Sequence, residues 1–262
     1  MSKAPHPPHR AILITGASRG LGAALARHFS APGVMLHLVA RGEAGLHATA
    51  ADCRGRGAEV HHAALDVRDA APLAARIEAW DDANPFDLVI ANAGVTGGTP
   101  PGGGMESWAS ADQVVGVNLV GAMNSVAPLL PRMVMRRAGR LVFIASVAAF
   151  RGLPDSPAYC ASKAGLWAYG ESLRARLRAE GVGVTVAAPG FFESDLSARF
   201  AGPHPGELSL EAMAGRLARG IEAGRGRIII PPLMGIGLRL LDLLPAPLVD
   251  RAMRFYRFRI RD

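Results

Sequence analysis

A tyrosine and a lysine four residues apart are the side chains in this sequence best suited to proton transfer. They are Tyr159 and Lys163, in the stretch SPAYCASKAG (156–165). Of the 29 basic residues, Lys3 and Lys163 are the two lysines, and the rest are arginines. A compact ammonium can rotate and exchange protons in a small site, whereas the planar guanidinium of arginine stays charged. The use of lysine at this position therefore indicates a chemical role.

The spacing of this pair places both side chains on one face of a helix. The ordinary pKa of tyrosine is near 10, about 2–3 units too high for efficient proton transfer at neutral pH. An ammonium about 4 Å away, at an effective dielectric constant near 20, contributes on the order of 4 kcal/mol. We therefore expect Lys163 to lower the pKa of Tyr159, so that the phenol can serve as a general acid or base.

A hydroxyl group is expected beside this pair. Ser146 ends the apolar run RLVFIAS (140–146), and Tyr159 follows thirteen residues later. Open α/β sheets bind their ligands at the carboxyl ends of the strands. Ser146 is therefore predicted to lie at the ligand-binding edge of the sheet.

The elements that position these groups follow from an alternation of apolar runs and helical patterns. The runs predicted as strands are 11–16, 34–40, 59–67, 86–94, 140–146, 183–190 and 227–231. Helical patterns between them include 21–30, 70–80, 112–137 and 158–180. Strands that alternate with helices pair in parallel through right-handed crossovers. The sequence thus predicts an α/β fold with a single Rossmann-type, doubly wound parallel sheet of about seven strands, flanked by helices.

Two longer segments interrupt this alternation. They are TGGTPPGGG (96–104), after the fourth predicted strand, and FFESDLSARFAGPHPGELS (191–209), after the sixth. Both are expected at the carboxyl ends of strands, where they would line a substrate pocket.

A glycine-rich turn, ITGASRGLG (14–22), follows the first predicted strand and opens the first helix. Gly16, Gly20 and Gly22 would allow the backbone to approach a pyrophosphate at the helix N-terminus. The same pattern also fits an ordinary strand-to-helix turn. The order of strand, glycine turn, helix and second strand favours dinucleotide binding.

The end of the second predicted strand bears on the choice of cofactor. An NAD site usually has a carboxylate there, which accepts a hydrogen bond from the ribose 2′-hydroxyl. This chain has Ala40 followed by Arg41, and Arg19 lies in the glycine turn. Guanidinium groups bind a 2′-phosphate through charge-assisted bonds. The pattern favours NADP(H), although either arginine would also suit a solvated surface position.

These motifs together resemble the short-chain dehydrogenase/reductase family. The resemblance covers residues 10 to 230 and rests on motifs in the family's order and spacing. They are TGASRGLG (15–22), NAG (92–94), NLVG (118–121), the set Ser146, Tyr159 and Lys163, and PG (189–190).

The resemblance implies a role for each catalytic candidate. Tyr159 would protonate a carbonyl oxygen as hydride arrives and act as the base in the reverse direction. Ser146 would orient that oxygen, and Lys163 would hold the nicotinamide ribose. Asn118 would anchor a water chain to Lys163; the alternative is an amide that caps a helix.

The resemblance also implies a set of cofactor-binding residues. Asp66 would contact the adenine, and Asn92 is expected to brace the sheet rather than to take part in chemistry. Ser194 stands where the family often has threonine, and it keeps the hydroxyl. Phe191 is bulky for this loop, and we expect it to pack in the core. The full set is Gly16, Ser18, Arg19, Gly20, Leu21, Gly22, Arg41, Asp66, Val67, Asn92, Ala93, Gly94, Tyr159, Lys163, Pro189, Gly190 and Ser194.

Composition limits the other classes of function. The net charge is +7, but the chain has no nucleic-acid-binding motif, and only three Trp and three Tyr could stack on bases. Cys53 and Cys160 have no partners at metal-ligand spacing, so no metal site is predicted. With no apolar signal segment at the N-terminus, a cytoplasmic protein is expected.

The final residues, 232–262, are predicted to extend the catalytic domain (10–231) as an amphipathic helical segment. The apolar run before Pro245 is too short and too charged to span a bilayer. Beyond Pro247, a helix would group apolar side chains such as Leu248 and Val249 on one face. Such a segment fits a subunit interface, a lid over the pocket, or peripheral contact with an anionic membrane.

The expected function is that of an NADP(H)-dependent oxidoreductase. It would interconvert a small, lipophilic ketone or aldehyde and the corresponding alcohol by hydride transfer. The alternative is a non-catalytic NADP-binding module that acts through its basic C-terminal segment. The family resemblance further implies a homodimer or homotetramer.

Overall fold

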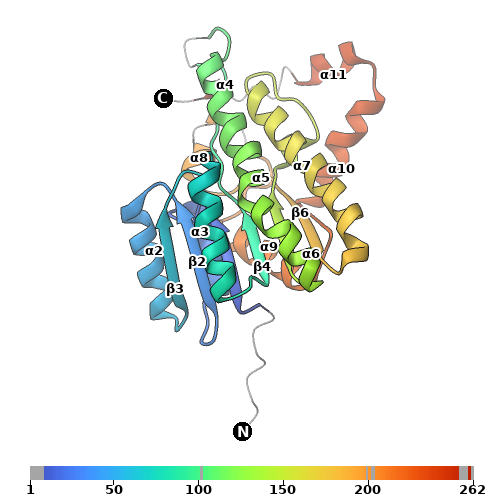
Figure 1. Cartoon of the computed structure of the whole chain (residues 1–262). Helices are drawn as coiled ribbons and strands as arrows, with labels where there is room; N and C mark the ends of the chain where they lie inside the picture. Colours follow the sequence, from blue (N-terminus) through green and yellow to red (C-terminus); the bar gives the residue numbers. More distant parts are fainter. Residues whose placement is uncertain (1–8, 101–102, 199, 202–203, 254–258, 261–262) are drawn as a thin grey trace.

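The computed structural model describes residues 9–100, 103–198, 200–201, 204–253 and 259–260. Its centre is a seven-stranded sheet in the order β3-β2-β1-β4-β5-β6-β8 (Figure 1). All of its strand pairs are parallel. The predicted fold class is therefore confirmed. The strands are β1 (Ala11–Thr15), β2 (Met35–Ala40), β3 (Glu59–Ala64), β4 (Leu88–Ala91), β5 (Arg140–Ile144), β6 (Gly183–Pro189) and β8 (Arg227–Ile230).

The sheet forms two apolar cores because both of its faces are covered, as a parallel sheet requires. Helices α1 (Gly20–Phe29), α2 (Glu43–Gly55) and α9 (Leu210–Glu222) pack on one face. Helices α3 (Ala70–Ala83) and α7 (Pro157–Leu177) pack on the other. The central strands are mostly apolar for this reason, and β1 is buried at every residue.

The predicted helix 112–137 is a chain of shorter helical pieces. It contains α4 (Trp108–Val115), a π-helical turn (Gly116–Val120), α5 (Gly121–Val126), a 3₁₀ turn (Ala127–Leu129) and α6 (Leu130–Arg136). By length and composition this stretch could cross a membrane. However, its buried residues Val117, Val126 and Met133 belong to the apolar core between the sheet and α3. It is a core helix of the α/β fold.

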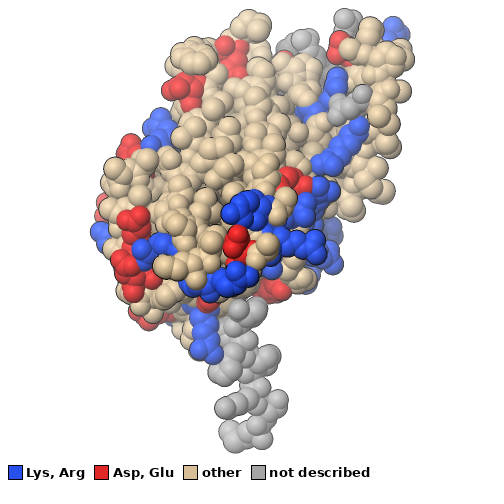
Figure 2. Space-filling model, turned by 45° about the vertical axis from the view of Figure 1, so that its right-hand side comes forward, with Lys and Arg blue, Asp and Glu red and all other residues tan. Residues whose placement is uncertain are grey.

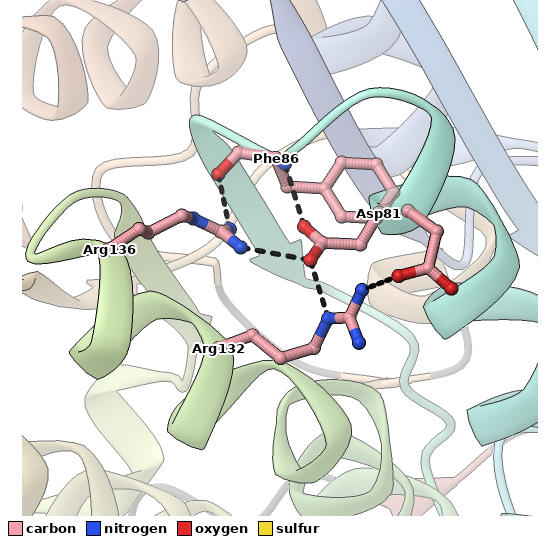
Figure 3. Close-up of polar contacts among 5 residues, drawn as sticks. Asp81, Phe86, Arg132 and Arg136 are labelled. Carbon is pink, nitrogen blue, oxygen red and sulfur yellow. Dashed lines mark hydrogen bonds and ion pairs between the residues drawn. The ribbon is translucent and has the colours of Figure 1, made fainter.

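A buried carboxylate joins α3 to α6 at the amino ends of the strands (Figure 3). Asp81 is 2% exposed and accepts hydrogen bonds from Arg132 Nε at 2.7 Å and from Arg136 Nη1 at 2.9 Å. The backbone N–H of Phe86 also donates to it, at 2.9 Å. Burial alone would raise the pKa of Asp81, but these donors hold it below the ordinary value. Arg132 also pairs with the exposed carboxylate of Asp82.

A small second sheet was not foreseen from the sequence. Strand β7 (Phe200–Ala201), within the long segment after β6, pairs antiparallel with β9 (Arg259–Ile260) near the end of the chain. Two-residue strands carry no periodic pattern, so nothing in the sequence marks this pairing.

The residues after β8 form a protruding arm. It consists of α10 (Pro232–Leu240), a 3₁₀ turn (Leu241–Leu243) and α11 (Ala246–Met253). Figure 1 shows α10 and α11 projecting from the sheet and its helices at the carboxyl end of the strands. We call residues 232–253 the C-terminal arm.

Candidate active site

One cavity brings the predicted site residues together. Its volume is about 1410 Å³, and it lies at the carboxyl ends of the strands, as expected for an open α/β sheet. All predicted site residues fall within the described part of the chain. Every one of them lines this cavity except Asn118, which lies behind its wall.

Tyr159 and Lys163 lie one turn apart near the start of α7. Lys163 Nζ is 5.9 Å from the centroid of the Tyr159 ring, so the predicted common face is observed. Both side chains are buried, with 8% and 4% of their surfaces exposed. Lys163 Nζ donates a hydrogen bond to the carbonyl oxygen of Ile144 at the end of β5, at 2.9 Å. The ammonium therefore links the catalytic helix to the central sheet.

The expectation that Lys163 lowers the pKa of Tyr159 is wrong for this structure. Burial raises the pKa of Tyr159 to about 12, and a side-chain hydrogen bond with Ser146 only partly opposes this. Burial also lowers the pKa of Lys163, to about 8. Desolvation disfavours the charged form of each group and is the largest cause of both shifts. At neutral pH the phenol is protonated, which is the form that can donate a proton.

Ser146 follows β5 at the predicted place. Its backbone is extended, and its Oγ accepts a hydrogen bond from the N–H of Ala148, at 3.1 Å, which caps a short 3₁₀ turn. This cap fixes the position of the hydroxyl next to Tyr159. The two hydroxyl groups share a hydrogen bond and can address one acceptor atom together.

Asn118 lies in the π-helical turn and is completely buried. Its Oδ1 accepts from the N–H of Val95 at 2.8 Å, and its Nδ2 donates to the carbonyl oxygen of Val95 at 3.0 Å. Nδ2 also donates to Ser162 Oγ on α7, at 3.1 Å. The alternative of a helix-capping amide is therefore wrong. Asn118 instead ties the loop after β4 to the catalytic helix, and π-helical turns are frequent at functional sites.

Gly94 brings Asn118 and Lys163 close together. A Cβ atom at this position would lie 3.4 Å from Asn118 Oδ1 and 3.5 Å from Lys163 Nζ. Both polar groups therefore flank the same glycine. This juxtaposition fits a role for Asn118 next to the ammonium.

The glycine turn leaves the space that a phosphate group requires. Gly16 has a φ of +68°, and a Cβ atom there would lie 2.7 Å from the Cα of Ala93. A Cβ atom on Gly22 would lie 2.2 Å from the carbonyl oxygen of Gly16. Only glycine fits at both positions, and the N-terminus of α1 then faces the cavity. The donor set and the open backbone fit a dinucleotide.

Asn92 braces the sheet, as predicted. Its Nδ2 donates to the carbonyl oxygen of Thr15 at 3.0 Å, and its own N–H donates to Thr15 Oγ1 at 3.2 Å. These bonds join the ends of β1 and β4 beneath the glycine turn.

The two arginines predicted for a 2′-phosphate both line the cavity and both contact carboxylates. Arg41 Nη1 lies 3.9 Å from Asp66 Oδ2. Asp66 is held more closely by Arg68, and this hydrogen bond, despite partial burial, lowers its pKa. Arg19 pairs with Asp195 at 2.8 Å, and both side chains are largely exposed. The partner of Arg19 could not be identified from the sequence, since the two residues are 176 positions apart.

The segment after β6 contributes more to the cavity than expected. Phe191, predicted to pack in the core, instead lines the cavity and stacks on His204, with ring centroids 4.7 Å apart. Ser194 also lines the cavity, and its Oγ accepts from the N–H of Ser197 at 3.0 Å, so it caps α8 (Asp195–Ala198). Arg199, in the same segment, lies outside the described residues.

The C-terminal arm forms an apolar wall of the cavity, with Leu233, Met234, Leu238 and Leu241. A lid over the pocket was one of the three alternatives predicted for this segment. Sequence reasoning missed another contributor to the site, Glu106.

Glu106 caps the catalytic helix from outside. Its Oε2 accepts from the N–H of Ala158 at 3.1 Å, and its Oε1 accepts from Ser110 Oγ at 3.1 Å. Ser156, the N-cap residue of α7, makes no side-chain capping bond. A carboxylate near a helix N-terminus is also favoured by the helix dipole. No local pattern predicts this contact, because Glu106 lies 52 residues before Ala158.

Comparison with other sequences agrees with this geometry. The family model for short chain dehydrogenases matches residues 10–202. An uncharacterized oxidoreductase of Myxococcus xanthus is 38% identical over 250 residues, which cover 95% of this chain and 98% of that protein. The ketoacyl reductase HetN of Nostoc is 35% identical over 184 residues, which cover 70% of this chain and 63% of that protein.

Solved structures show the same architecture. A short chain dehydrogenase/reductase from Burkholderia phymatum in complex with NAD is 26% identical, with a TM-score of 0.79, over 97% of this chain and 96% of that one. A metagenomic short-chain oxidoreductase in complex with NADP is 26% identical, with a TM-score of 0.70, over 84% of this chain and 96% of that one. The chain therefore belongs to the short-chain dehydrogenase/reductase family and is an oxidoreductase.

Proposed function

We propose that this protein is an NADP(H)-dependent reductase of lipophilic ketones or aldehydes, with the reverse oxidation of alcohols at the same site. The observation that carries the proposal is the buried, protonated phenol of Tyr159, one turn from Lys163 and hydrogen-bonded to Ser146. A phenol in this state can donate a proton to a carbonyl oxygen. The name of the Nostoc relative, a ketoacyl reductase, is consistent with this direction.

The residues act as follows. Ser146 Oγ and Tyr159 Oη hold the carbonyl oxygen of the substrate, and the Tyr159 proton moves to that oxygen. A bound nicotinamide cofactor supplies the hydride that reaches the carbonyl carbon. Lys163 would hold the nicotinamide ribose through the donor positions that its bond to Ile144 leaves open. Asn118 holds the loop after β4 against the catalytic helix through its bonds to Val95 and Ser162.

The cavity supports a lipophilic substrate. Phe191 and the four apolar residues of the C-terminal arm line it, together with Leu153. Its volume of about 1410 Å³ exceeds the usual range for one small ligand, so it has room for cofactor and substrate together.

Cys53 and Cys160 are unpaired, which suits the cytoplasm proposed as the compartment of this protein.

The test of the enzymatic proposal is NADPH oxidation with a panel of ketones of increasing chain length. Tyr159→Phe is expected to lower kcat by about 10²–10⁴-fold, because general acid catalysis contributes this much. Tyr169→Phe is the matched control, since Tyr169 lies on the same helix, packs on Phe143 and does not line the cavity. Its activity is expected to stay close to that of the wild type.

Two results would contradict this assignment. One is a Tyr159→Phe variant that binds NADPH and reduces ketones as fast as the wild type. The other is a wild-type protein that binds NADPH with no turnover on any ketone, which would favour the non-catalytic NADP-binding module.

The preference for NADP(H) is proposed from Arg41. The side chain is about half exposed at the cavity, and no carboxylate precedes it at the end of β2. Arg41→Ala is expected to raise the KM for NADPH by about tenfold and to leave the KM for NADH nearly unchanged, because only NADPH carries the 2′-phosphate. Arg56→Ala, an exposed arginine outside the cavity, is the control. Equal effects on both cofactors would contradict the proposal.

A further inference from the structure

The C-terminal arm exposes an unusual amount of apolar surface. Among the described residues, six of the ten large exposed hydrophobic side chains lie between positions 233 and 248. Leu233 and Leu243 are each 80% exposed. The others are Ile236, Leu240, Leu244 and Leu248. Contiguous apolar surface of this kind marks an interaction site.

Helix α10 is apolar on two opposite sides. On the inner side, Met234 and Leu238 line the cavity. On the outer side, Ile236 and Leu240 face solvent. Arg239 anchors the helix, because its guanidinium lies 4.3 Å from the ring centroid of Phe150 and 5.2 Å from that of Trp167. A helix with two apolar sides is stabilised when both of them are covered.

The charge of the segment distinguishes between possible occupants of the outer side. Residues 232–262 contain six arginines and three aspartates. Two copies of this positively charged segment would repel each other, whereas an anionic surface would attract it. Figure 2 shows the arm at its upper right as a mostly uncharged surface with basic side chains beside it.

We propose that the C-terminal arm binds the surface of an anionic membrane. The outer side of α10 and the following 3₁₀ turn would insert among the lipids, and the net positive charge of residues 232–262 would attract the segment to anionic head groups. The inner side of the same helix lines the cavity, so the arm would place that cavity beside the bilayer. A lipophilic substrate could then reach the site from the membrane. This last step depends on the proposed function, whereas membrane binding itself does not.

The experiment is co-sedimentation of the full chain with vesicles of phosphatidylcholine alone or with about 30% phosphatidylglycerol. The wild type is expected to pellet with the anionic vesicles and much less with the neutral ones. The test variant combines Ile236→Gln, Leu240→Gln and Leu243→Gln, which lie outside the cavity. It is expected to lose binding by roughly tenfold or more, because apolar insertion is removed. Met135→Gln, an exposed apolar residue on α6, is the control.

Each outcome decides the proposal. Failure of the wild type to bind anionic vesicles would overturn it, as would equal binding of the triple variant. If the triple variant instead dissociates an oligomer in light scattering and keeps its vesicle binding, the arm is an interface between copies, and the proposal is wrong. Vesicle binding is measured without cofactor, and Tyr159→Phe is expected to bind like the wild type. A failure of the proposed function is therefore distinguishable from a failure of this inference.

Discussion

Two buried charged side chains, one at each end of the sheet, differ in how many polar partners they have. Asp81, at the amino end, is 2% exposed and meets two guanidinium groups and a backbone N–H. Lys163, at the carboxyl end, is 4% exposed and donates to one carbonyl oxygen. Within the described part of the chain, no carboxylate pairs with it. The same degree of burial therefore accompanies full pairing at one end and partial pairing at the other.

The difference appears in the pKa values. The donors around Asp81 hold its pKa below the ordinary value and fix its charge. Burial lowers the pKa of Lys163 to about 8, so its proton is held less firmly than in water. A fully paired charge joins α3 to α6 and serves the fold. A partly paired charge costs stability, and it leaves two donor positions for the ligands of a reaction.

The largest expected effect on stability comes from removal of the fully paired carboxylate of Asp81. Asp81→Ala is expected to lower the free energy of unfolding by about 3 kcal/mol, because it leaves two arginines and a backbone N–H without their acceptor. Asp82→Ala is the control, since Asp82 also pairs with Arg132 but is 67% exposed, and its loss should cost about 1 kcal/mol or less. Urea denaturation measures both. Equal losses would show that burial does not distinguish the two carboxylates.

A buried histidine extends the comparison to a group that is kept neutral. His37 on β2 is 2% exposed and packs between His61, Trp80 and Phe86. Burial, with a smaller effect of His61, lowers its pKa to about 4. Between pH 6.5 and 4, His37 binds a proton in the unfolded chain but stays neutral in the folded chain. The free energy of unfolding therefore falls as the pH falls.

The neutral state of His37 is expected to lower the free energy of unfolding by about 2–3 kcal/mol between pH 6.5 and pH 4.5. His37→Leu lacks this titration, and the carboxylates titrate equally in both proteins. The difference in unfolding free energy between variant and wild type should therefore grow in favour of the variant as the pH is lowered. A constant difference across this range would contradict the assignment.

Removal of the partly paired charge of Lys163 should stabilise the fold, in contrast to the loss of Asp81. Lys163→Met is expected to raise the unfolding free energy by about 1–2 kcal/mol while it abolishes activity. Removal of a desolvated charge, worth about 3 kcal/mol for a pKa lowered to about 8, outweighs the lost bond to Ile144. The gain should be largest below pH 8 and should disappear as the pH rises toward 10.5, because the folded protein then loses the proton first. Destabilisation by Lys163→Met at pH 7 would refute this interpretation.

The smallest expected effect concerns the external cap of the catalytic helix. Glu106→Ala is expected to cost about 1 kcal/mol of stability and to lower kcat more than it raises KM, since the start of α7 carries Tyr159. Glu106→Gln keeps an acceptor for the N–H of Ala158 and should restore most of both. Thermal unfolding and NADPH oxidation measure the two effects. No difference between the two variants would assign Glu106 to packing alone.

The sequence predicted the sheet and most of the site because both depend on local patterns. Continuous apolar runs identify strands that are covered on both faces, and the four-residue spacing placed Tyr159 and Lys163 on one side of α7. The pKa of Tyr159 could not be predicted from the sequence, since the depth of burial depends on distant elements. For the same reason the pairing of Arg19 with Asp195, the cap from Glu106 and the position of Phe191 appear only in three dimensions.

The π-helical turn at Gly116–Val120 holds one residue more than an α-helical turn would. Each residue of a helix advances the chain by about 100° around its axis. Deletion of one residue there would restore regular winding and leave α4 and α5 nearly in phase, because the wider turn absorbs the extra residue. The extra residue therefore serves the position of Asn118: its deletion would move that amide away from Val95 and Ser162 while the flanking helices keep their places.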